Sequence, residues 1–377
     1  MSEDHAARVE ELLDEASLLE DGPAKVMLLE EAARVADTHG DAELGFVARQ
    51  DLIHAATFGG YPEKALVAFT WSLAHCDRAE GGQLGHSMLW KYKWIANVLP
   101  EFPHITLAQI GGVLDDMTAR YEKAGMSLRA VHKLRCGTAM GMGDRSAARA
   151  HHRAWQQAPA DAVSDCAACE RNHRVKYLFF QGKDEQGLAH AGPILQGRLR
   201  CAEIPHATLA HVLLPLVRLG RLEEAMAYHR QGLRLVTRNR SFVREVAMHM
   251  TFLALTDNLG HAVRLLERHL PWALEKEGQA RRFDFFLAAR LVLDRLAASG
   301  KSAVRLRLPQ GFALHSESGK YDVGELADWF DADLQALAAR FDARNGTDRF
   351  ARRIAENRAL KELVVPFPVP TRRQGGE

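Results

Sequence analysis

Long uninterrupted apolar runs are missing from this 377-residue sequence. No stretch approaches the ~18 consecutive apolar residues that a membrane-spanning helix requires, so we expect no membrane span. The first residues, MSEDHAARVEELLDEA, are acidic and amphipathic, and they therefore predict no secretory signal peptide. These absences favour a cytoplasmic protein.

Cysteine and aromatic residues are also scarce. The five cysteines are Cys76, Cys136, Cys166, Cys169 and Cys201. An odd and low count argues against the disulfide framework of small secreted domains. Aromatic residues make up only 7% of the chain, whereas Ala, Leu, Arg and Glu are abundant, and this mixture favours helices.

The chain carries almost no net charge, with a formal value of +1. Such a chain has no strong overall field to attract nucleic acid or an anionic membrane, and we expect neither as a partner. The charges are unevenly placed, however. Residues 1–43 contain 13 acidic and 3 basic residues, whereas residues 127–182 contain 9 Lys/Arg, 4 acidic residues and four histidines. This distribution can orient a charged partner.

The sequence signatures of common enzyme classes are absent as well. The chain has no dinucleotide-binding or P-loop glycine pattern, no GxSxG nucleophile elbow and no kinase motif set. It also lacks the HExxH and HxE…PCxxC patterns of zinc enzymes. We therefore predict that the protein is not an enzyme.

What the sequence does contain is one short phrase that occurs four times. The phrase consists of a glycine, four residues that include charged ones, a small residue and then a helical apolar pattern. It reads GYPEKALVAF, GDRSAARAHH, GKDEQGLAHA and GRLEEAMAYH, beginning at Gly60, Gly143, Gly182 and Gly220. Because each phrase follows a helical stretch, we interpret it as the turn of a helical hairpin. The glycine accepts a left-handed backbone there, and the small residue (Ala65, Ala148, Gly187 or Ala225) lets the two helices approach closely.

These features resemble the tetratricopeptide-repeat family, in its stand-alone bacterial form. The best match is LPLVRLGRLEEAMAYHRQGLRLV (214–236), in which the family's glycine-to-alanine spacing falls on Gly220 and Ala225. The resemblance covers residues 5–298, with a repeat somewhat longer than the family's ~34 residues. It implies an all-α protein in which antiparallel helical hairpins stack into a right-handed superhelix with a continuous core.

We predict that residues 1–300 form this solenoid and that residues 301–377 cap its end. The seven expected hairpins are 5–37, 41–78, 84–124, 127–157, 165–197, 206–238 and 241–276, and a helix over 280–298 follows them. The capping segment is expected to contain an extended stretch, a helix that ends at Asn345-Gly346 and a loose tail. Pro100 and Pro103 should separate the helices of the third hairpin, and Pro215 should kink the first helix of the sixth.

The stretch DCAACE (165–170) raises the possibility of metal binding. Cys166 and Cys169 open the fifth hairpin, while Cys201 and His206 lie where the sixth begins. Equivalent ends of neighbouring helices lie ~8–10 Å apart, so these four residues could converge as a Cys₃His shell for one structural zinc. Two alternatives stay open: a thiol pair with a redox function, or small side chains buried at a helix junction.

Two basic stretches, SLRAVHKLRCG (127–137) and ERNHRVKYLFF (170–180), fall on the first helices of their hairpins. The resemblance implies that these helices line the concave face of the superhelix. The candidate groove residues are Arg129, His132, Lys133, Arg135, Arg171, His173, Arg174, Lys176 and Tyr177. A basic groove suits an acidic peptide or protein, so we predict a regulatory scaffold or adaptor. The alternatives are a solvated helix face, and a zinc-dependent sensor or enzyme centred on the cysteines.

Overall fold

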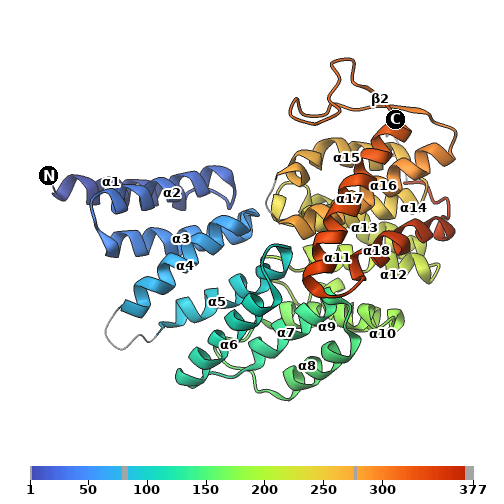
Figure 1. The fold of residues 1–377 in the computed structure, drawn as a ribbon. Coiled ribbons are helices and arrows are strands. Elements are labelled where there is room, and N and C mark those ends of the chain that lie inside the picture. Colours follow the sequence, from blue (N-terminus) through green and yellow to red (C-terminus); the bar gives the residue numbers. More distant parts are fainter. Residues whose placement is uncertain (1, 79–83, 276–277, 370–377) are drawn as a thin grey trace, which may run out of the picture. The chain divides into compact units, whose positions relative to one another are not determined.

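The computed structural model describes residues 2–78, 84–275 and 278–369. Nearly all regular structure in these residues is helical, so the predicted all-α class is confirmed (Figure 1). The chain divides into two compact units. Unit 1 comprises Met1–Asp165 and Asn239–Ser241, and unit 2 comprises Cys166–Arg238 and Phe242–Glu377.

Unit 1 is built from consecutive helices that pack in pairs. The elements are α1 (Ser2–Ser17), α2 (Pro23–Thr38), α3 (Ala42–Gly59), α4 (Pro62–Arg78), α5 (His86–Val98), the 3-10 turn η1 (Leu99–Glu101), α6 (Leu107–Lys123), α7 (Arg129–Met142) and α8 (Arg145–Gln157). Each odd-numbered helix packs against the helix that follows it. These four pairs correspond to the first four hairpins predicted from the sequence.

Unit 2 continues the pairing and adds the C-terminal segment. Its pairs are formed by α9 (Ala167–Phe180) with α10 (Asp184–Leu195), by α11 (His206–His211) and α12 (Leu213–Arg218) with α13 (Leu222–Val236), and by α14 (Val243–Leu255) with α15 (Leu259–Leu274). A 3-10 turn, η2 (Arg240–Phe242), precedes α14. The last elements are α16 (Gln279–Ala298), β1 (Ala303–Arg305), β2 (Lys320–Asp322), α17 (Val323–Asn345), α18 (Arg349–Ala359) and η3 (Leu360–Leu363).

The repeated phrase forms the hairpin turns, as predicted. Between α7 and α8, Gly143 has a φ of 78°, in the left-handed region that a side chain disfavours. Asp144 follows it and caps α8 by accepting hydrogen bonds from two backbone N–H groups of the first turn. Ala148 is completely buried. In the next hairpin, a Cβ atom on Gly187 would lie 2.3 Å from the ring of Phe179, so only glycine fits between α9 and α10.

Proline interrupts the helices where the sequence predicted. The first helix of the sixth hairpin is divided into α11, which ends at His211, and α12, which begins at Leu213. Pro215 causes this break because it has no N–H to donate to the carbonyl of His211 and its ring crowds that carbonyl. Pro100 lies in η1, and Pro103 lies between η1 and α6. The helices of the third hairpin are separated accordingly.

The C-terminal segment packs on the last helices of unit 2. Helix α17 packs on α16, and β1 and β2 form an antiparallel pair in which Val304 faces Tyr321. The chain after η3 is extended and follows the α14–α15 turn, where the N–H of Val365 donates to the carbonyl of Leu255. The amide of Asn258 accepts a hydrogen bond from the N–H of Val369. Residues 370–377 of the predicted tail lie outside the described residues, and the capping role stays a prediction.

An acidic side chain is held between two arginines in the core of unit 2. Asp284 on α16 forms ion pairs with Arg244 on α14 and with Arg353 on α18. Burial by itself would raise the pKa of Asp284, but the charges and hydrogen bonds of Arg353 and Arg244 lower it overall. This network links three helices that are far apart in the sequence.

Two buried histidines make unit 2 sensitive to acid. His229 on α13 and His249 on α14 are nearly inaccessible, and their Nδ1 atoms lie 3.0 Å apart. Burial lowers the pKa of His229 to about 4 and that of His249 well below its ordinary value. Repulsion from a neighbouring histidine, once that neighbour is protonated, acts in the same direction, from His261 on His229 and from His229 on His249. Both imidazoles are therefore neutral in the folded protein.

We expect unit 2 to lose stability as the pH falls from about 6.5 to about 4. An unfolded histidine takes up a proton at a pH of about 6.5, whereas folded His229 does so only at about 4. This difference corresponds to roughly 3 kcal/mol that is present above pH 6.5 and lost below it. Urea unfolding of the protein and of a His229→Gln variant between pH 7.5 and 4.5 measures it. Equal pH slopes for the two proteins would contradict the assignment.

Candidate functional site

Three cysteine side chains gather at the start of α9 in unit 2. Cys166 immediately precedes the helix, Cys169 lies in its first turn, and Cys201 lies in the loop between α10 and α11. The three Sγ atoms all lie within 4.8 Å of one another, and those of Cys169 and Cys201 are 3.2 Å apart. Within the described ranges, no other cluster of His, Cys, Asp or Glu has the geometry of a metal site.

Local backbone geometry explains why the thiols converge. Cys166 is extended and its carbonyl accepts the N–H of Glu170, so the helix begins directly after it. The three-residue spacing then places Cys169 almost one helical turn further on, beside Cys166. In the other segment, the N–H of Cys201 donates to the carbonyl of Ile204 at 2.9 Å, which turns the chain back toward α9. Cys169 and Cys201 pack on a small apolar cluster that contains Ala168, Ile194, Ile204 and Ala207.

The contact between Cys169 and Cys201 separates the acidities of the two thiols. The hydrogen bond with Cys201, followed by burial, raises the pKa of Cys169. The same hydrogen bond lowers the pKa of Cys201 to about 5, against the opposing effect of burial, and backbone N–H groups of the following turn contribute. The contact therefore favours a thiolate at one of the two sulfur atoms, with the other thiol as its hydrogen-bond donor. A thiolate is the form in which cysteine binds metals and acts as a nucleophile.

The fourth predicted ligand, His206, does not belong to this cluster. Its ring stacks on Phe242, with ring centroids 5.2 Å apart and planes inclined by 6°. Its Nδ1 atom is buried and makes no hydrogen bond within the described residues. The turn from Cys201 to Ile204 occupies the short connection before α11, and the imidazole at the start of that helix therefore packs on Phe242. The site that the structure assembles has three cysteines, where the sequence suggested a Cys₃His set.

The three sulfur atoms suit a single thiophilic ion. Zn–S bonds of about 2.3 Å at tetrahedral angles place sulfur atoms about 3.8 Å apart. Here the Cys169–Cys201 separation is 3.2 Å, and all three sulfur atoms lie within 4.8 Å of one another. Small side-chain rotations would therefore bring the thiolates to ideal spacing. Cys166 is exposed and the other two are half-buried, so a fourth ligand would approach from the solvent side.

The basic residues predicted for unit 1 are engaged by groups of the same unit. Arg129 is buried and donates to the carbonyls of Trp155 and Ala158, at 3.0 and 2.7 Å. Arg135 on α7 forms an ion pair with Asp115 on α6 at 2.6 Å. These two arginines hold their own unit together, which leaves them little freedom to bind a partner. His132 beside them is half-buried, and burial lowers its pKa.

Lys133 on α7 shares an acidic partner with Lys93 on α5. Both Lys133 and Lys93 contact the carboxylate of Asp165, Lys93 at 2.8 Å. Lys93 is almost fully buried and also donates to the carbonyl of Val163. Its role was not readable from the sequence because 72 residues separate it from Asp165.

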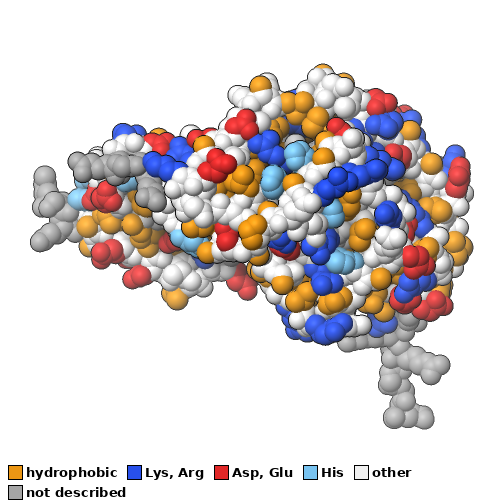
Figure 2. Space-filling view, turned by 90° about the horizontal axis from the view of Figure 1, so that it is seen from below, with side chains coloured by type: hydrophobic (Ala, Val, Ile, Leu, Met, Phe, Trp, Pro, Cys, Tyr) orange, Lys and Arg blue, Asp and Glu red, His pale blue; other side chains and the backbone are white. Residues whose placement is uncertain are grey.

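The remaining predicted groove residues lie on α9 in unit 2. Arg171 donates to the carbonyl of His190 at 3.2 Å, and Tyr177 is buried. His173, Arg174 and Lys176 are half-buried. Because the nine predicted residues are divided between two units, a single groove formed by all of them stays a prediction. Figure 2 shows acidic and basic side chains interspersed on the face that it draws, in keeping with a net charge of +1.

Comparison with known proteins does not assign the chain to a family. No protein-family model matches the chain, and no curated protein matches it. The resemblance to tetratricopeptide repeats therefore rests on the sequence pattern alone. None of the described helices combines the length and apolar character that crossing a membrane requires.

Proposed function

We propose that this protein binds one zinc ion through Cys166, Cys169 and Cys201. The observation that supports this proposal is the convergence of three Sγ atoms within 4.8 Å from two segments of the chain. Most cysteines are small hydrophobic side chains that need no such neighbours. Three thiols brought this close repel one another once ionised, and a bound cation removes that repulsion.

The donor set favours zinc over other common ions. Calcium and magnesium prefer oxygen ligands, whereas thiolates suit zinc and copper(I). Tetrahedral zinc accepts three protein thiolates and leaves one position for water or another donor. The exposed side of Cys166 provides access to that position. A three-ligand arrangement of this kind allows the fourth ligand to exchange. We assign the fourth position to water or to a donor from a bound partner.

Zinc would connect the start of α9 to the α10–α11 loop. Cys169 and Cys201 are 32 residues apart, and the loop between α10 and α11 has no strand or helix of its own in the described structure. A metal that binds only the folded arrangement adds its binding free energy to folding. We therefore assign the ion a role in fixing this loop, and through it the position of α11. Catalysis is not part of the proposal.

A titration of the reduced, metal-free chain tests this function. Zinc added in competition with a chromophoric chelator should fill one site per chain and raise the thermal midpoint. A count of reactive thiols should fall by three when zinc is bound. If instead no zinc binds and two thiols disappear on mild oxidation, the thiol pair is a redox pair and the metal proposal is wrong.

Our second proposal is that the stacked hairpins form a right-handed superhelix that binds a protein or peptide partner. The role of this binding would be regulatory. The consecutive helical pairs support it, because such pairs bury a shared core and present long outer faces. The unit 1 cations Arg129, Lys133 and Arg135 contribute little to it, since they bind carboxylates and carbonyls of their own unit. In unit 2, by contrast, α13 and α15 carry arginines that have no carboxylate partner among the described residues.

A further inference from the structure

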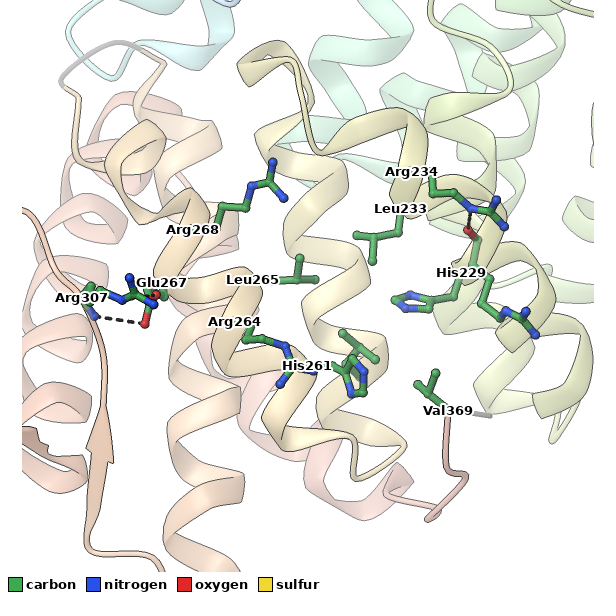
Figure 3. A pocket seen from close by; sticks show the side chains of 12 residues that line it. His229, Leu233, Arg234, His261, Arg264, Leu265, Glu267, Arg268, Arg307 and Val369 are labelled. Carbon is green, nitrogen blue, oxygen red and sulfur yellow. Dashed lines mark hydrogen bonds and ion pairs between the residues drawn. The ribbon is translucent and has the colours of Figure 1, made fainter. Parts of the chain in front are cut away.

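A cavity of about 730 Å³ lies in unit 2 between α13, α14 and α15. Its size falls within the range of pockets that hold small molecules, about 300–1,000 Å³. Figure 3 shows the side chains of α13 and α15 facing each other across it, with Leu233 and Leu265 between the two helices. Leu253 of α14 also lines the cavity, and Val369 of the extended tail lies at one edge.

Helical periodicity gives the cavity a basic rim around an apolar floor. On α13, Arg230 and Arg234 are one turn apart and flank Leu233; on α15, Arg264 and Arg268 are one turn apart and flank Leu265. All four arginines are exposed, whereas Leu265 is buried and Leu233 is half-buried. The two helices therefore contribute matching stripes, with cations outside and leucines inside.

The positive charge of the four arginines at this rim is not neutralised by paired carboxylates of the described residues. Among the described residues, none of the four arginines forms an ion pair with a carboxylate. The cavity contains one acidic side chain, Glu267, and it lies 3.6 Å from a fifth arginine, Arg307. Three other arginines of the unit, Arg244, Arg282 and Arg290, all pair with aspartates. Four like charges around one cavity raise the local potential and favour an anion.

We propose that this cavity binds a small organic phosphate of the nucleotide class. Phosphate oxygens would be held from opposite walls by Arg264 and by the terminal nitrogens of Arg234, whose Nε donates to the carbonyl of Arg230 at 3.1 Å. A planar guanidinium can donate two parallel hydrogen bonds to a phosphate. The flat organic part of the ligand would lie on Leu233 and Leu265. A basic rim alone suits any anion, whereas the apolar floor selects one with a hydrophobic body. The site is separate from the cysteine cluster and does not depend on the zinc proposal.

Isothermal titration with adenosine triphosphate tests the site, on the full reduced chain without added metal. We expect one binding event per chain with a dissociation constant in the micromolar range. A double variant, Arg234→Ser with Arg264→Ser, should weaken binding at least ~10-fold, a change of about 1.4 kcal/mol. Arg340→Ser is the matched control because Arg340 is exposed on α17, away from the cavity lining. It should bind like the unaltered protein.

A second comparison tests the apolar floor. Inorganic pyrophosphate carries phosphates without an organic body, so we expect it to bind more weakly than adenosine triphosphate. Leu233→Ser should reduce this difference, and circular dichroism would verify that each variant is folded. The proposal is overturned if adenosine triphosphate gives no binding at millimolar concentration or binds the arginine double variant equally well. It is also overturned if pyrophosphate, or an oligoglutamate peptide, competes as effectively as the nucleotide.

Discussion

Replacing Asp284 with alanine is expected to lower the free energy of unfolding of unit 2 by roughly 3 kcal/mol. Removing one member of a buried ion pair leaves buried charge uncompensated, which costs about 3–5 kcal/mol. The lower end applies here because the side chains of Arg244 and Arg353 keep 31% and 26% of their exposure. Asp284 itself is 13% exposed and pairs with both, so its loss affects α14, α16 and α18 together.

A matched surface pair separates this effect from loss of charge alone. Asp348 and Arg352 form an exposed ion pair at 2.8 Å in the same unit, and such pairs contribute about 0–1 kcal/mol. Asp348→Ala should therefore change stability by less than about 1 kcal/mol. Urea unfolding combined with amide hydrogen exchange in α16 provides the measurement. Equal effects of the two substitutions would show that the Asp284 network is not a core element.

Replacing Cys201 with serine should weaken zinc binding by more than ~100-fold. Loss of a residue that merely supports a metal ligand already costs about 10–100-fold, and a direct ligand contributes more. Cys169→Ser should behave in the same way, because both sulfur atoms lie in the close pair. In both variants, with or without added zinc, the α10–α11 loop should exchange its amide hydrogens faster than it does in the zinc-loaded unaltered protein.

Cys76→Ser provides the control for this series. Cys76 is half-buried in unit 1 and belongs to no cluster of potential metal ligands among the described residues. Its replacement should leave zinc affinity and the exchange of the α10–α11 loop unchanged. If the Cys76 and Cys201 variants bind zinc equally, the ion is held elsewhere in the chain and the three-cysteine site is wrong.

Local signals in the sequence predicted the helical pairs well. The phrases at Gly143 and Gly220 form turns because a glycine with positive φ and a following helix start are encoded within about six residues. The break at Pro215 was predictable for the same reason, since a missing N–H acts on the preceding turn. None of these features depends on distant parts of the chain.

Side-chain partners were less predictable because they depend on how the hairpins pack. The sequence placed Cys166, Cys169 and Cys201 together, but the orientation of His206 depends on the turn before α11 and on Phe242. Similarly, the basic run at 127–137 was compatible with a binding surface or with a solvated helix face. Its partners Asp115 and Asp165 lie 20 and more residues away, and no pattern in the run itself indicates them.

The arginines of α13 and α15 illustrate the same limit. Their spacing of one helical turn was visible in HRQGLR (229–234) and RLLER (264–268), yet charged residues at such spacing usually lie on an ordinary solvated face. Only the packing of α13, α14 and α15 shows that the two stripes border one cavity.

X-ray absorption at the zinc edge of the zinc-loaded protein tests the central claim most directly, because it identifies the atoms bound to the metal. The three-cysteine site predicts a first shell of three sulfur atoms at about 2.3 Å and one lighter atom at about 2.0–2.1 Å. A first shell made only of nitrogen and oxygen, or a protein that retains no zinc, would contradict it.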